Sequence, residues 1–145
     1  VDDCAIRKEN NSEETSERDC VGFCVTGGVF SEGIDLKNES LIGCIIVGTG
    51  IPQICTERRL LKDYYDEKDG NGYNYAYTYP GMNKVLQAAG RVIRTMDDVG
   101  VIVLLDERFA RSEYVRLFPA EWADYKLCNL KEVPRLVAEF WDGHS

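Results

Sequence analysis

The sequence predicts an α/β domain with a mostly parallel sheet and helices on both faces. Three apolar runs predict strands, at about Val21–Thr26, Leu41–Gly48 and Val101–Leu105. Their near-continuous hydrophobicity is typical of strands that are buried on both sides. Segments with helical hydrophobic spacing alternate with these runs, which favours a parallel sheet. A length of 145 residues suits one hydrophobic core, so we expect a single domain over residues 1–145.

The first forty residues contain short elements and a glycine-rich segment. Asp3–Arg7 fits a short strand, and the acidic stretch Asn11–Asp19 fits a short helix capped at Ser12. Glycines in Thr26–Leu36 follow a predicted strand, where they let backbone N–H groups approach a ligand closely. The alternative is a strand-to-helix turn with Asp35 as the cap, and this segment taken alone favours that alternative.

A helix with a partly apolar face is predicted after the second strand. Pro52 suits its first turn, and Asp69–Gly72 breaks the chain after it. Four tyrosines then alternate with other residues, at Tyr73, Tyr75, Tyr77 and Tyr79. They could stack on nucleic-acid bases. Packing of an extended segment against the core is the favoured interpretation, because period-two spacing is typical of such a segment.

The next segment predicts a helix over Met82–Thr95 with two different faces. Its apolar stripe has helical spacing and consists of Met82, Val85, Leu86, Ala89, Val92 and Ile93. Gln87, Arg91 and Arg94 share the opposite face at positions i, i+4 and i+7. Arginine suits phosphate because it carries a permanent charge and a planar fork of donors. A solvated basic face on an ordinary amphipathic helix is the alternative.

An acidic pair, Asp106 and Glu107, ends the third predicted strand and imitates a magnesium site. No phosphate-binding loop precedes it, so we interpret the pair as a strand-end turn in which Asp106 pairs with Arg108. We therefore predict no metal site. A short helix over Arg111–Phe118 and an amphipathic helix over Leu130–Trp141 complete the chain.

The composition limits the classes of partner. Seventeen basic and 25 acidic residues give a net charge of −8, which argues against a broad nucleic-acid surface. Cys24 and Cys44 lie in apolar runs and no C-x-x-C pair occurs, so we expect reduced thiols in a cytoplasmic protein. No apolar run reaches the length of a membrane span, and no signal peptide opens the chain.

Two ordered motifs carry a family resemblance. G-G-x-F-S-E-G-I-D-L from Gly27 and Q-A-x-G-R-x-I-R from Gln87 resemble motifs V and VI of superfamily 2 nucleic-acid helicases. The residues of the two motifs most resemble those of the DinG/XPD branch, and the resemblance covers roughly Val21 to Trp122. It implies a RecA-like P-loop NTPase fold, namely the second, C-terminal motor domain of a larger DNA helicase. Such domains begin with a further strand and helix, so we expect this one to be N-terminally truncated.

The same resemblance implies roles for individual residues. Arg91 and Arg94 would be catalytic arginine fingers that reach the triphosphate of ATP, which the missing first domain would hold with Mg²⁺. Five further residues would contact the nucleotide or couple it to the predicted helix Met82–Thr95, which carries the arginines: Gln87, Gly90, Glu32, Gly33 and Asp35. Thr26, Gly27, Gly28 and Ser31 would face single-stranded DNA.

The resemblance also sets expectations for the isolated chain. It has no G-x-x-x-x-G-K-[ST] loop, so we expect it to be inactive without the first helicase domain, its implied partner. Any iron–sulfur cluster would lie outside this chain.

Two other classes of function compete with this interpretation. The chain could be a non-enzymatic interaction domain that keeps the helicase fold. The intact arginines argue against this, whereas a deletion within Asn11–Asp19 would favour it. A Rossmann-type dinucleotide-binding enzyme is disfavoured, because Gln53 stands where the Gly48-Thr49-Gly50 segment would need its third glycine.

Overall fold

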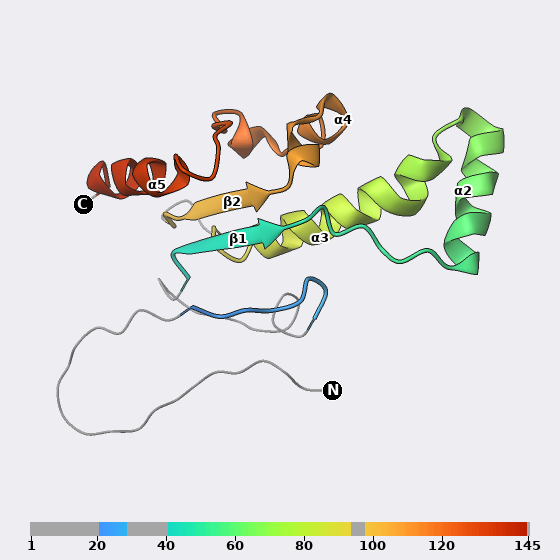
Figure 1. Cartoon of the computed structure of the whole chain (residues 1–145). Coiled ribbons are helices and arrows are strands. Elements are labelled where there is room, and N and C mark those ends of the chain that lie inside the picture. The colour runs from blue at the N-terminus through green and yellow to red at the C-terminus, as the bar shows by residue number, and fades with distance from the viewer. Residues whose placement is uncertain (1–20, 29–40, 94–97, 145) are drawn as a thin grey trace, which may run out of the picture.

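The structure is a computed structural model that describes residues 21–28, 41–93 and 98–144 (Figure 1). Two strands, β1 (Gly43–Val47) and β2 (Val101–Leu105), pair in parallel with Gly43 opposite Val101 and Val47 opposite Leu105. The helices are α2 (Thr56–Asp69), α3 (Tyr79–Ala89), α4 (Ser112–Val115) and α5 (Val133–Asp142). Short turns of other helical types are η1 (Asn74–Thr78), η2 (Glu107–Ala110) and η3 (Ala120–Trp122). The second and third predicted strands are therefore confirmed, in the expected parallel arrangement.

The core lies on one face of this small sheet. Alternate strand residues, Cys44 and Ile46 in β1 with Ile102 and Leu104 in β2, pack with α3 and with Phe109 and Tyr114. On the other face, Ile45 and Val47 are 67% and 71% exposed. Helices on both faces thus remain a prediction, because within the described residues the second face of β1 is open.

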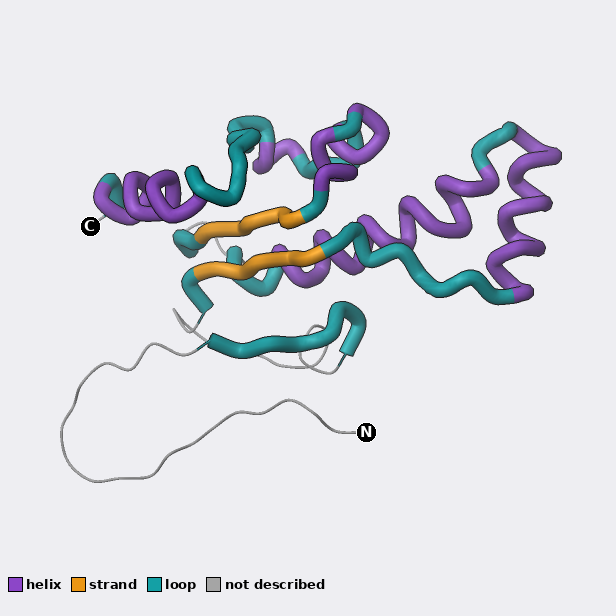
Figure 2. The backbone as a smooth tube through the Cα atoms, in the orientation of Figure 1, coloured by secondary structure: helices purple, strands orange, loops and turns teal. Residues whose placement is uncertain are grey.

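The predicted strand at Val21–Thr26 is wrong. These residues form no strand, and the side chains of Val21, Phe23 and Val25 are exposed. The segment still lies near β1, and Figure 2 shows it as an extended loop below that strand. An apolar run records a tendency toward burial, whereas a strand also needs a hydrogen-bonded partner backbone. The elements expected at Asp3–Arg7 and Asn11–Asp19 lie outside the described residues.

Helix α3 confirms most of the predicted apolar stripe but ends earlier than expected. Met82, Val85, Ala89 and Val92 are buried. The helix ends at Ala89. The prediction of a helix to Thr95 is therefore wrong for residues 90–93, and residues 94 and 95 lie outside the described residues. The N–H groups of Arg91 and Val92 donate to Ala88 O and Ala89 O at 3.2 and 3.0 Å, three residues back. This tightening is common in a last helical turn, and Gly90 favours it because glycine weakly supports helix.

The tyrosine segment is helical, so its prediction as an extended segment is wrong. Residues 74–78 form the π-turn η1, which runs directly into α3. Pro80 has no N–H to donate to the carbonyl of Ala76 four residues earlier. Arg58 of α2 donates to that oxygen instead, at 2.6 Å, and so joins α2 to this turn. The tyrosine rings pack on one another and on α2, with Tyr65 and Tyr75 stacked at 4.1 Å between centroids.

The start of α3 crosses the loop after β1 at two glycines. Gly50 adopts a left-handed φ of 63°, and a side-chain carbon on it would lie 2.9 Å from Gly81 O. A side-chain carbon on Gly81 would lie 2.6 Å from Thr49 O. The two backbones are therefore in direct contact, which fixes the loop against the helix.

Gly81→Ala is expected to lower the melting temperature. Alanine normally stabilises a helix by about 0.5–1 kcal/mol relative to glycine. Here its methyl group would press on a backbone carbonyl, and such overpacking typically costs about 1–3 kcal/mol. Thermal melts of the variant test this. Gly22→Ala is the control, because nothing lies within 4 Å of a side-chain carbon there. A Gly81→Ala protein that melts at or above the wild-type temperature would contradict the close contact.

Candidate functional site

The carboxyl end of β1 brings together two glycine-containing segments and one lysine. The first segment is the turn Val25–Gly28, in which Gly28 N–H donates to Val25 O at 3.0 Å and Gly27 has φ 85°. The second is the loop that follows β1, from Gly48 to Ile51. Lys84 of α3 lies against both, because a side-chain carbon on Gly27 would be 3.5 Å from its Nζ and one on Gly50 would be 3.6 Å from its Cβ. Ligands of open α/β sheets commonly bind at this end of the strands.

The residues expected at the nucleotide lie toward the other end of α3. Gln87 and Gly90 are exposed, and Arg91 is half-buried in the turn that follows the helix. The next residue, Val92, packs against Gly100 beside Ile42, where β1 and β2 begin. Arg91 is therefore placed near the amino ends of the strands.

The structure thus separates two groups of predicted site residues. The turn Thr26–Gly28 lies at the carboxyl end of β1. Gln87 in the last turn of α3, and Gly90 and Arg91 just after that helix, lie away from this end. Because Arg91 lies beyond the last helical residue, its shared helical face with Gln87 is not formed as predicted. Five further predicted site residues, Ser31, Glu32, Gly33, Asp35 and Arg94, lie outside the described residues.

The acidic pair after β2 forms the turn that the sequence predicts. Asp106 accepts hydrogen bonds from Arg108 at its backbone N–H (2.9 Å), Nε (2.9 Å) and Nη2 (2.7 Å). These hydrogen bonds to Arg108 hold the pKa of the Asp106 carboxyl at about 2. The interpretation of Asp106 as a strand-end turn residue paired with Arg108 is confirmed.

Asp106→Asn is expected to destabilise the chain at neutral pH and to have little effect in strong acid. A carboxyl whose folded pKa lies below its ordinary 3.8 stabilises the fold fully above that value, and this contribution is lost as the pH falls from about 4 to 2. The side chains of Asp106 and Arg108 are 15% and 37% exposed, so solvent screening limits the effect to at most about 2 kcal/mol. Denaturant unfolding of both proteins between pH 7 and pH 2 checks this. A stability difference that stays constant over this range would contradict the assignment.

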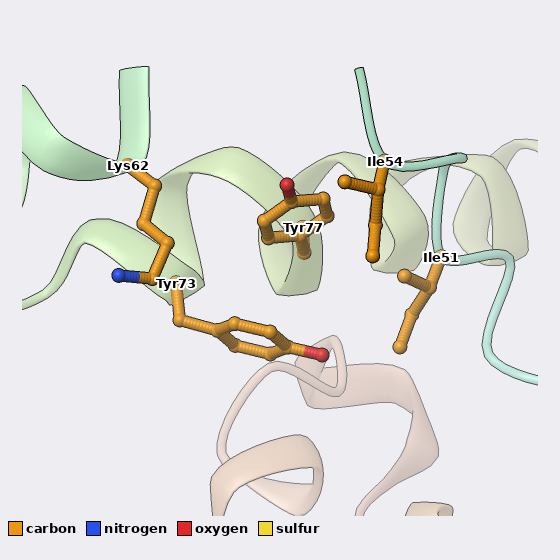
Figure 3. Close-up of a pocket in the computed structure, with 5 residues that line it drawn as sticks. All are labelled: Ile51, Ile54, Lys62, Tyr73 and Tyr77. Carbon is orange, nitrogen blue, oxygen red and sulfur yellow. The ribbon is translucent and has the colours of Figure 1, made fainter. Parts of the chain in front are cut away.

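A small open pocket of about 280 Å³ lies between three parts of the chain: the loop after β1, helix α2, and the helical segment that contains Tyr73 and Tyr77. Figure 3 shows Ile51 and Ile54 of the loop on one side, with Tyr77 between them and the side chains of Tyr73 and Lys62. Lys62 Nζ is already paired with Asp66 Oδ2 at 2.5 Å. The pocket is therefore mainly apolar, and its one cation is engaged, so it offers little to a highly charged ligand.

Several other kinds of site have no counterpart in the described part of the chain. Residues 21–28, 41–93 and 98–144 include no group of three or more side chains that could hold a metal ion. Cys24, Cys44, Cys55 and Cys128 are free thiols, and burial raises the pKa of the Cys44 thiol to about 11. None of the helices described is long and apolar enough to cross a membrane.

Lys84 lies at this end of the sheet, although the sequence predicts no role for it. From the helical pattern alone, Lys84 is an ordinary polar residue of α3 that lies between the buried residues Met82 and Val85. The signal available in the sequence is the glycine at position 50, which belongs to the turn Gly50–Gln53 after the second predicted strand. Its contact with Lys84 depends on the crossing of the loop and α3.

Comparison with known proteins gives a consistent result. Residues 6–125 match the protein family described as helicase C-terminal domain. The chain is 31% identical over 126 residues to ATP-dependent DNA helicase chl-1 of Caenorhabditis elegans, which covers 85% of this chain and 15% of that protein. It is 36% identical over 97 residues to the General transcription and DNA repair factor IIH helicase subunit XPD/RAD3 of Saccharomyces cerevisiae, covering 65% and 12%. It is 35% identical over 89 residues to ATP-dependent DNA helicase DinG of Photobacterium profundum, covering 60% and 13%.

Proposed function

This chain belongs to the helicase C-terminal domain family, in its DinG/XPD-like branch of superfamily 2, and on that premise we propose that it is the second, RecA-like motor domain of an ATP-dependent DNA helicase. The chain spans only 12% to 15% of the length of the relatives compared above. We therefore propose that residues 1–145 form one domain of a longer protein whose first motor domain supplies the phosphate loop.

The proposed role of the arginines rests on the placement of Arg91. It is a half-buried arginine in a tight turn after α3, and the backbone N–H groups of the turn are already bonded to Ala88 and Ala89. A fixed backbone limits the freedom of the guanidinium, whose planar fork suits two phosphate oxygens. We propose that this guanidinium contacts the triphosphate held by the first domain. Arg94 is proposed to act beside it.

The other nucleotide-side residues would position ATP rather than react with it. Gln87 and Gly90 are exposed at the end of α3 and so are available to a ligand that docks there. We propose that the ribose is coupled to the turn that contains Arg91 by three further residues, Glu32, Gly33 and Asp35. Mg²⁺ would neutralise charge on the phosphates, and we propose that it is held mainly by the first domain, together with the phosphate loop.

The DNA side is proposed at the turn Thr26–Gly28, with Ser31 following it. The turn lies at the carboxyl end of β1 and away from Arg91, so DNA and nucleotide would contact different ends of α3. A motor domain of this kind could then couple hydrolysis to DNA movement. This division is the observation that most favours a motor domain over a passive interaction domain.

The isolated 145-residue chain is expected to hydrolyse no ATP. It has no phosphate loop, so one half of the shared site is missing. A single-stranded-DNA-stimulated ATPase assay should read at background for the chain and well above background for the full-length protein. Turnover by the isolated chain that disappears in Arg91→Ala would show that the site is complete within it. A full-length protein that binds DNA without ATPase activity would instead favour the non-enzymatic interaction domain.

A further inference from the structure

Lys84 is held across two glycine segments instead of extending into solvent. Its Cβ lies beside Gly50 and its Nζ beside Gly27, so the side chain runs from the loop after β1 to the turn Val25–Gly28. Within the described residues its ammonium group forms no ion pair. A half-buried cation without a carboxylate partner is notable in a chain whose net charge is −8. Its position suits a bound anion.

The loop beside Lys84 offers further hydrogen-bond donors. The backbone N–H groups of Thr49, Gly50 and Ile51 donate to no acceptor within the described residues. Successive N–H groups around a residue of left-handed conformation form concavities that bind anions, and Gly50 has φ 63°. The chain therefore places three unpaired donors and one ammonium group at the same end of β1.

Thr49 provides a second, independent observation. Its side chain is 1% exposed, and its Oγ1 has no hydrogen-bond partner. A buried hydroxyl without a partner carries a desolvation penalty of about 1–3 kcal/mol. Polar groups of this kind are uncommon in folded proteins, so Thr49 marks the loop after β1 as a segment whose hydrogen bonding is incomplete.

We propose that Lys84 and the Thr49–Ile51 loop bind a phosphate group of the DNA backbone. The chemistry is that of any phosphate oxyanion, so ATP is the other possible source. Arg91 is seven residues further along the chain, about 10 Å at the helical rise. Arg91 lies near the amino ends of the strands, whereas Lys84 lies at the carboxyl end of β1. The triphosphate proposed for Arg91 would therefore bind at a different site from the phosphate proposed for Lys84. The assignment to DNA rests on the proposed helicase function.

The test uses the full-length protein that contains this chain and compares Lys84→Met, Lys84→Gln and Lys84→Arg with wild type. Methionine retains an unbranched stem against Gly27 but removes the charge, and arginine keeps the charge. Lys126→Gln is the matched control, because Lys126 is exposed and lies outside this site. Fluorescence anisotropy with labelled oligothymidine at several salt concentrations gives the Kd and its salt dependence. A fluorescent ATP analogue gives nucleotide affinity, and thermal melts report folding.

Lys84→Met and Lys84→Gln are expected to raise the Kd for DNA on the order of fivefold. They should reduce the slope of log K against log salt by about 0.7, the value for one phosphate of single-stranded DNA. Lys84→Arg and Lys126→Gln should bind DNA like wild type, and ATP affinity should be unchanged throughout.

Three results would overturn the proposal. The first is an unchanged salt slope in both charge-removing variants. The second is weaker binding of ATP with normal binding of DNA, which would assign the phosphate to the nucleotide. The third is equal loss of DNA affinity and melting temperature in all three Lys84 variants, which would make Lys84 a packing residue. If the wild-type protein had no DNA-stimulated ATPase activity, this would count against the proposed function alone. The measurements of DNA binding do not depend on ATP hydrolysis.

Discussion

Arg91→Lys and Arg91→Ala in the full-length protein are expected to lower kcat sharply while ATP affinity changes little. An arginine finger stabilises charge that develops on the transferred phosphoryl group and can contribute ~10³–10⁵ in rate. Lysine keeps one positive charge but loses the planar fork, so it should replace arginine poorly. The lost interaction is stronger in the transition state than in the ground state, which is why kcat falls rather than ATP binding.

Steady-state ATPase kinetics with saturating DNA, together with ATP titrations, measure these two quantities separately. Arg116→Ala is the control, because Arg116 is an exposed arginine after α4, far from the end of α3 in sequence. Arg94→Ala should also reduce turnover. Wild-type kcat in Arg91→Lys and Arg91→Ala, with melting temperatures unchanged, would eliminate the finger and leave an ordinary solvated basic position.

Val92→Asp is expected to unfold the domain, although it is the immediate neighbour of Arg91. Val92 is 5% exposed and packs against Gly100, where the two strands begin. The substitution removes buried apolar surface and places a carboxylate at a position that is shielded from water. The combined loss should exceed about 3 kcal/mol, a large share of the typical 5–15 kcal/mol of a domain.

The adjacent residue supplies a matched control. Ile93 is 43% exposed, so Ile93→Asp should change the free energy of unfolding far less than Val92→Asp. Circular dichroism and denaturant unfolding of the 145-residue chain distinguish the two variants. Equal destabilisation by both would show that the chain turns differently after Ala89, and it would weaken the placement of Arg91 as well.

The sequence by itself determined β1, β2 and the buried stripe of α3. Runs such as Val101–Leu105 are apolar at every position, and Met82, Val85 and Ala89 recur at helical spacing, so local pattern and burial agree. The Asp106 turn was also readable, because Asp106 pairs with Arg108 only two residues away. The family resemblance rested likewise on two short, ordered motifs, and the match over residues 6–125 confirms it.

Only the tertiary structure decided features that depend on contacts between distant segments. Val21–Val25 has the composition of a strand, yet these residues form no strand, and the side chains of Val21, Phe23 and Val25 are exposed. The tyrosines alternate in sequence but lie on a helical segment, with Tyr75 and Tyr77 on the π-turn η1. In that turn Arg58 of α2 donates a hydrogen bond to the Ala76 carbonyl, which Pro80 cannot do because it has no N–H. Lys84 gained its place only because Gly50 and Gly81 let the loop after β1 touch α3. Periodicity records which side chains prefer burial, whereas pairing, register and the approach of two backbones are set by groups far apart in the chain.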